Sequence, residues 1–248
     1  MMKGIYLSNI DPEQSFGYMP KILGQVKGLT QLGIDMELVC FNADSKISLV
    51  TCLCAETKCE LSVEILGSAG GGLLIRRLNL FKSTLRQISI NRPDFLYLRY
   101  PRSEPLYLWF LFRVRMCLPE IIILSEFPTF PYDAEYKRAI TVKDKLVFGL
   151  DKLTRKYLKY FLDQIIAINY ERPIFEIPAI SIDNGINVAD YAVRAKLQDS
   201  NHPVICLIGV ANVSPWHGYD RILKGLADYL KRPIFSRRKV IFHIVVAR

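Results

Sequence analysis

The sequence predicts an α/β fold: a doubly wound parallel sheet over residues 1–185, followed by the first β-α-β segment of a second, incomplete unit over residues 186–248. Three observations lead to this prediction. The chain opens with a strand, loop, helix and strand, an order that calls for parallel strands joined by a right-handed crossover. The same order restarts near Val204. Between them, Ile121–Leu124 is a short apolar run typical of a central parallel strand buried on both faces.

The first β-α-β unit is the clearest part of the pattern. Gly4–Ser8 reads as a strand, and Gly17–Leu32 has apolar residues at helical spacing. Gly33 follows as a C-terminal stop, and Asp35–Phe41 is the second strand.

The remaining elements are expected in the following order. They are two antiparallel edge strands, a helix, a strand, a helix, the central strand, a long helix and two strands: Ile47–Cys54, Cys59–Leu66, Leu74–Ile90, Asp94–Tyr100, Leu106–Cys117, Ile121–Leu124, Ala139–Phe161, Gln164–Ile168 and Ile177–Ile182. After a boundary at Gly185 and a linking segment, the second unit has a strand, a helix and a strand: Val204–Ile208, Tyr219–Leu230 and Lys239–Val245.

Charge and apolar content limit the partners. The net charge of +9 favours an anionic partner, but no nucleic-acid-binding module is recognisable, so nucleic acid is not expected. Pro105–Phe112 is apolar but too short to span a membrane. It indicates either a buried amphipathic helix or contact with an anionic membrane surface. The N-terminus lacks a signal-peptide pattern, which predicts a cytoplasmic protein.

The six cysteines show no paired zinc spacing. In a cytoplasmic protein they are expected to be reduced, buried thiols. No metal site and no cofactor are predicted.

Ligands of an open parallel sheet bind beyond the carboxyl ends of its strands, which selects the polar residues that follow each predicted strand. Arg99 and Arg102 flank Pro101, and either could clamp a phosphate or carboxylate. The alternative is that they pair with Glu104 or Glu126.

The segment SEFPTFPYD follows the central strand and is stiffened by two prolines. Glu126, Thr129, Tyr132 and Asp133 supply donors and acceptors suited to sugar hydroxyls. Glu126 and Asp133 are the predicted catalytic residues, while Thr129 and Tyr132, with Arg99 and Arg102, are predicted to bind the acceptor. Asp133 could instead cap the next helix.

Two loops at helix starts are suited to anions, because helix N-termini present free N–H groups and a partial positive charge. Gly17 begins the first helix, and the stretch GVANVSPWHGYDRILKGL contains Asn212, His217 and Gly218. These four residues are the predicted donor-binding set. Capping by Gly17 and a surface position for His217 are the structural alternatives.

Taken together, four stretches make the chain resemble a bacterial glycosyltransferase with two Rossmann domains, the GT-B type, similar to the retaining family 4 enzymes of capsule and exopolysaccharide synthesis. They are FGYMPKILGQVKGLTQLGIDMELVCFN, FLYLRYPRSEP with SEFPTFPYD, INYERPIFEIPAISIDNGINV and GVANVSPWHGYDRILKGL.

The resemblance implies a first domain that binds a lipid-linked sugar acceptor and a second that binds a nucleotide-sugar donor, without a metal, at the inner face of the plasma membrane. It also implies a glycine turn after the strand that begins VIFHIV, then basic residues and paired glutamates on the donor side, where this chain reads VVAR. The expectation is therefore a truncated, weak or inactive transferase. The alternative is a glycan-binding or scaffolding module that needs a partner chain for the donor half.

Overall fold

The computed structural model describes residues 1–9, 18–55, 58–99, 102–133, 141–183, 185, 204–210, 218–231, 233 and 238–245. By its internal contacts the chain divides into two units, Met1–Val188 and Ala189–Arg248. Each unit is described by itself.

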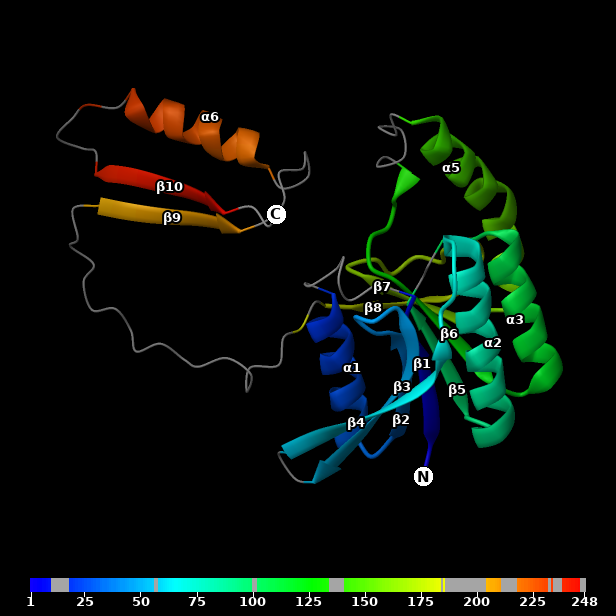
Figure 1. Cartoon of the computed structure of the whole chain (residues 1–248). Coiled ribbons are helices and arrows are strands. Elements are labelled where there is room, and N and C mark those ends of the chain that lie inside the picture. Colours follow the sequence, from blue (N-terminus) through cyan, green and yellow to red (C-terminus); the bar gives the residue numbers. More distant parts are fainter. Residues whose placement is uncertain are drawn as a thin grey trace. The chain divides into compact units, whose positions relative to one another are not determined.

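The first unit is built on an eight-stranded, mostly parallel sheet with the strand order β4-β3-β2-β1-β5-β6-β7-β8 (Figure 1). Six strands run parallel: β1 (Lys3–Leu7), β2 (Asp35–Phe41), β5 (Phe95–Arg99), β6 (Ile122–Phe127), β7 (Gln164–Ile168) and β8 (Ala179–Ile182). The other two, β3 (Lys46–Ala55) and β4 (Lys58–Ser68), form an antiparallel hairpin at one edge. The α/β class and the antiparallel edge hairpin are therefore confirmed.

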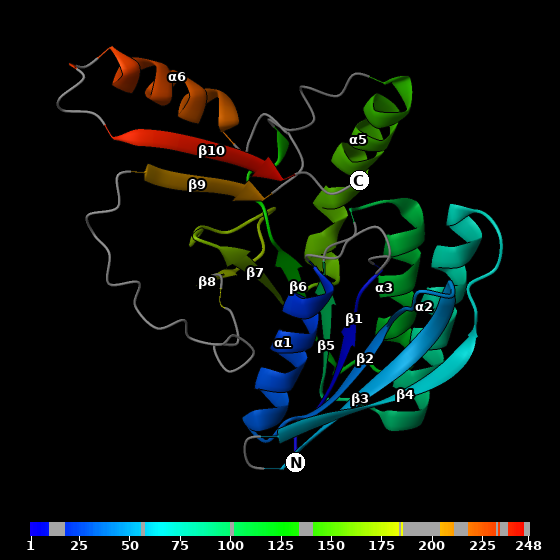
Figure 2. The same cartoon turned by 60° about the vertical axis from the view of Figure 1, so that its left-hand side comes forward.

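Helices cover both faces of this sheet (Figure 2). Alternate residues of a strand point to opposite faces. Tyr6 of β1 accordingly packs with Ile22 and Val26 of α1 (Met19–Gln31), whereas Ile5 and Leu7 belong to the core on the other face.

The second face is covered by α2 (Leu73–Asn91), α3 (Pro105–Cys117) and the 3-10 helix η1 (Arg155–Tyr160). Phe81 of α2 stacks on Phe110 of α3 with ring centroids 4.4 Å apart, and Leu158 of η1 is fully buried in the same core. Of the apolar run at Pro105–Phe112, Tyr107, Phe110 and Leu111 are buried. Trp109 and Phe112 of this run remain exposed.

One predicted boundary is wrong in a way that matters for the site. The central strand β6 continues to Phe127, so Glu126 lies inside the strand and not in the following loop. The predicted long helix is α5 (Val142–Thr154) followed by η1. Within the described ranges, no helix is long and apolar enough to cross a membrane.

The second unit contains β9 (Val204–Val210), α6 (Tyr219–Leu230) and β10 (Lys239–Val245), with the two strands parallel and in register. This confirms the predicted β-α-β segment. Gly209 lets the strand approach the helix, since a Cβ at this position would lie 2.6 Å from a ring carbon of Tyr219. Gly218 begins α6 with a φ of 71°, a conformation that favours glycine.

Candidate functional site

The strand order places a topological switch point between β1 and β5. The chain leaves β1 for β2 on one side, and the later parallel strands β6, β7 and β8 follow β5 on the other side. Ligands of open α/β sheets bind beyond the carboxyl ends of the strands at such a point. Arg99 at the end of β5 and Glu126 near the end of β6 are neighbours here, because they are directly paired in the sheet register.

Glu126 is completely buried and holds a network of polar side chains. Its Oε1 accepts a hydrogen bond from Arg99 Nη1 at 3.0 Å. Its Oε2 accepts hydrogen bonds from Tyr97 and from Gln25 of α1, both at 3.0 Å. The Tyr6 hydroxyl donates to Gln25 Oε1 at 2.9 Å and lies 3.4 Å from Glu126 Oε2. The predicted pairing of Arg99 with Glu126, one of the two alternatives, is thus present.

The two tyrosines of this network stay neutral. Burial first, and then the negative charge of Glu126, raise the pKa of Tyr6 and Tyr97 well above the usual tyrosine value. Their rings stack with centroids 4.7 Å apart. Tyr97 therefore donates a hydrogen bond to Glu126, Tyr6 donates one to Gln25, and neither tyrosine acts as a base.

Arg99 keeps one polar atom unsatisfied among the described residues. The residue is 4% exposed, and its Nη2 is buried without a hydrogen-bond partner there. Its guanidinium lies 5.4 Å from the ring centroid of Tyr18, the residue before α1. Lys21 in the first turn of α1 lies close enough that burial, followed by the charge of Arg99, lowers its pKa. Two cations and a helix N-terminus therefore meet at the switch point.

Asp133 and Tyr132 belong to a second cluster. Asp133 forms a bidentate pair with Arg155, with contacts of 2.6 and 3.1 Å, which raises the pKa of Arg155 further. Tyr132 is buried and donates to Asp151 at 3.0 Å. Asp133 therefore contacts η1, and its predicted catalytic role stays a prediction.

The remaining predicted site residues are exposed or lie elsewhere. Thr129 and Arg102 are exposed, and Arg102 has a φ of 89°. Gly218 lies in the second unit. Gly17, Asn212 and His217 lie outside the described residues, so the donor-binding set is largely untested.

Sequence reasoning missed Tyr6, Lys21, Gln25 and Tyr97. The two tyrosines lie within strands and were absorbed into the apolar pattern, while Lys21 and Gln25 lie within the first helix. Gln25 was the signal that could have indicated this network, because it is a polar residue beside Val26, an apolar position of the helix that packs on the sheet.

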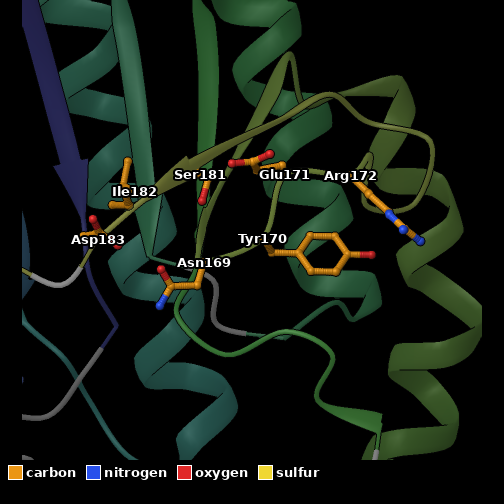
Figure 3. Close-up of a pocket in the computed structure, with 7 residues that line it drawn as sticks. All are labelled: Asn169, Tyr170, Glu171, Arg172, Ser181, Ile182 and Asp183. Atoms are coloured by element: carbon orange, nitrogen blue, oxygen red, sulfur yellow. The ribbon is translucent and has the colours of Figure 1, made fainter.

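An open cavity of about 680 Å³ lies at the carboxyl ends of β7 and β8 (Figure 3). Asn169 and Asp183 follow the paired strand ends Ile168 and Ile182, and Glu171, Arg172 and Ser181 add to the polar lining. This position fits the rule used to select candidate residues, since Asn169–Glu171 follow a predicted strand. Its mixed charges suit a polyhydroxylated ligand better than an apolar one.

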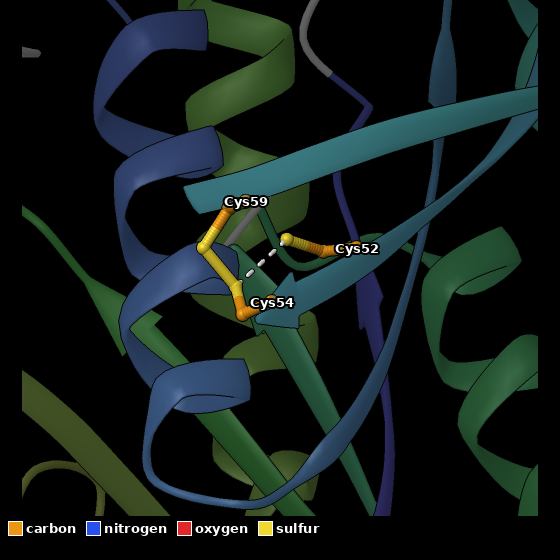
Figure 4. A group of neighbouring side chains, drawn as sticks. All are labelled: Cys52, Cys54 and Cys59. Carbon is orange, nitrogen blue, oxygen red and sulfur yellow. Dashed lines mark hydrogen bonds between the residues drawn. A yellow bond between two sulfur atoms is a disulfide. The ribbon is translucent and has the colours of Figure 1, made fainter. Parts of the chain in front are cut away.

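Four of the six cysteines differ from the prediction of reduced, buried thiols, whereas Cys40 and Cys52 are free and buried as predicted. Cys54 and Cys59 are joined by a disulfide across the edge hairpin, and Cys52 Sγ lies 3.6 Å from Cys54 Sγ (Figure 4). The three sulfur atoms lie within 4.8 Å of one another, a grouping that could hold a soft metal if it were reduced. Cys117 is exposed, as is Cys206. The prediction failed because residues directly opposite in a hairpin lie close enough for a bond, which spacing alone does not reveal.

Comparisons with known proteins identify no family for this chain. No protein-family model matches the chain, and no curated protein matches it. Among solved structures, one match is an inactive zymogen C11 protease from Parabacteroides distasonis, with a TM-score of 0.33 and 10% identity. The match covers 66% of this chain and 41% of that protein. A likeness at this level supports no inference about function.

Proposed function

We propose that the protein is a glycosyltransferase of the doubly wound, two-domain GT-B type, which transfers a sugar from a nucleotide-sugar donor to a lipid-linked glycan acceptor. The supporting observation is the buried Arg99 Nη2 without a described partner, beside Lys21 and the N-terminus of α1. A buried polar atom left unpaired costs about 1–3 kcal/mol. A phosphate oxygen would satisfy Arg99 and also favour the protonated form of Lys21.

In this proposal each cluster has a separate task. Arg99, which the sequence assigned to the acceptor, instead binds a phosphate group of the donor together with Lys21, and the polar cavity after β7 and β8 binds sugar hydroxyls. Glu126 holds Arg99 in place through the 3.0 Å ion pair, while Thr129 and Arg102 present exposed polar groups to the acceptor. The proposed location is the cytoplasm, at the inner face of the plasma membrane, where lipid-linked acceptors are found.

The test is release of nucleoside diphosphate from a panel of uridine, guanosine and thymidine diphosphate sugars, with and without a lipid-linked glycan. We expect weak turnover with at least one donor. Lys21→Gln should weaken donor binding by about tenfold, which is the loss of one charge-assisted hydrogen bond. Lys27→Gln, on the same helix, is the matched control and should leave binding unchanged. Equal binding by both variants would contradict the phosphate site.

A second candidate is a non-catalytic glycan-binding or scaffolding module that works with a partner chain. It is favoured by one observation: both predicted catalytic carboxylates are engaged in ion pairs, Glu126 with Arg99 and Asp133 with Arg155. This candidate predicts glycan binding in a glycan array or by calorimetry without any nucleoside diphosphate release. Turnover by the purified chain alone would rule it out.

A further inference from the structure

The helix α5 presents its leucines outward and polar side chains inward. The 3-10 helix η1 that follows buries Leu158 but leaves Tyr157 and Tyr160 exposed. On the inner side, Asp151 is fully buried and Thr154 is 8% exposed. On the outer side, Val142, Leu146 and Leu153 are 74%, 70% and 64% exposed. A surface helix of a globular domain normally has the opposite arrangement.

Polar contacts fix this orientation. Asp151 accepts hydrogen bonds from the Ser103 backbone N–H at 2.9 Å and from the Tyr132 hydroxyl at 3.0 Å. Arg155 is held by its bidentate pair with Asp133. Rolling the helix to hide its leucines would break the buried contacts of Asp151, so the apolar side stays outward.

The outward residues form one continuous band, which we call the apolar stripe. It consists of Val142, Leu146, Leu150, Leu153, Tyr157 and Tyr160, all exposed. Steps of three and four residues place the α5 members on a single face of the helix. Contiguous exposed apolar surface of this kind marks a contact site.

The charges beside the apolar stripe indicate what covers it. Lys145, Lys152 and Lys156 are exposed. The two acidic residues of α5 face elsewhere: Asp144 is engaged with Thr141 at the start of the helix, and Asp151 is buried. With a net charge of +9, the chain is complementary to a negatively charged surface that also accepts leucine side chains.

We propose that the apolar stripe docks onto an anionic phospholipid surface, with the leucines inserted at the acyl-chain boundary and the three lysines against the headgroups. Helices that lie in a membrane interface combine an apolar face with lysines on the polar side, and tyrosine is enriched at the depth of the headgroups. The docking rests only on the membrane location in the proposed function. It does not depend on sugar transfer, and its test contains no donor.

The experiment is co-sedimentation of the full chain with vesicles of phosphatidylcholine alone or mixed with phosphatidylglycerol. We expect binding to the mixed vesicles that weakens as salt is raised, and little binding to phosphatidylcholine alone. The double variant Leu146→Gln/Leu153→Gln should bind at least about tenfold more weakly. The triple variant Lys145→Gln/Lys152→Gln/Lys156→Gln should lose about a hundredfold.

The matched control is Leu73→Gln/Leu74→Gln in α2, whose side chains are 68% and 67% exposed. It should bind like the unchanged chain, and thermal melts should show all variants folded. Equal loss in both leucine variants, equal binding to the two vesicle types, or no binding at low salt would overturn the proposal. Dimerisation that depends on Leu146 and Leu153, without vesicle binding, would also overturn it by identifying a second copy as the occupant.

Discussion

Removing one partner of the buried ion pair between Arg99 and Glu126 is predicted to destabilise the first unit strongly. Their side chains are 3% and 0% exposed, and the pair is 3.0 Å long. Glu126→Gln keeps the shape of the side chain but leaves the Arg99 charge uncompensated in the core. Breaking a buried pair from one side costs about 3–5 kcal/mol, which corresponds to a fall in Tm of about 10 °C for a unit of this size.

The assay is urea unfolding followed by tryptophan fluorescence. The sequence has two tryptophans, so a Trp216→Phe background leaves Trp109 of α3 as the reporter of the first unit alone. This choice avoids fitting two units as one transition.

Two further variants make the result interpretable. Glu120→Gln breaks the exposed pair with Arg92, in which the Arg92 and Glu120 side chains are 66% and 68% exposed, and should cost less than about 1 kcal/mol. Arg99→Met/Glu126→Gln removes both charges and should recover much of the loss. If Glu126→Gln costs no more than Glu120→Gln, the buried pair does not hold the core together and the reasoning is wrong.

Three other results are expected. Burial raises the folded-state pKa of Glu37, so folding favours its protonated form. Glu37→Gln should therefore raise the urea midpoint at pH 7, and the difference from the unchanged chain should fade below a pH of about 4. A difference that stays constant with pH would show that the Glu37 charge is not its cause. In non-reducing buffer Cys117 should react quickly with a thiol reagent, whereas Cys54 and Cys59 should react only after reduction, as mass spectrometry can show. Gly209→Ala should destabilise the second unit by about 1–3 kcal/mol, seen as faster hydrogen exchange in β9 and α6; unchanged exchange would mean that the Tyr219 ring moves aside freely.

The order of the elements could be predicted because it depends on local pattern. Apolar residues at helical spacing, such as Ile22 and Val26, gave α1 nearly its observed limits. The strand at Asp35–Phe41 and the helix at Tyr219–Leu230 were predicted at their observed limits. The end of β6 was predicted too early because Ser125 and Glu126 are polar. Glu126 can occupy a buried strand position because it accepts hydrogen bonds from Tyr97, Gln25 and Arg99, which the local pattern does not reveal.

The sequence alone determined that this is an α/β chain with a parallel sheet, an antiparallel edge and a second β-α-β segment. These features depend on the spacing of apolar residues within each short segment of the chain. It also selected Arg99 and Glu126 as residues worth weighing. Only the tertiary structure decided that they pair with each other, that Cys54 and Cys59 are bonded, and that α5 presents its leucines outward. The Arg99–Glu126 pair and the orientation of α5 depend on side chains that are distant in the chain, and the disulfide depends on the register of a hairpin whose two cysteines are five residues apart. Periodicity within one segment carries no such information.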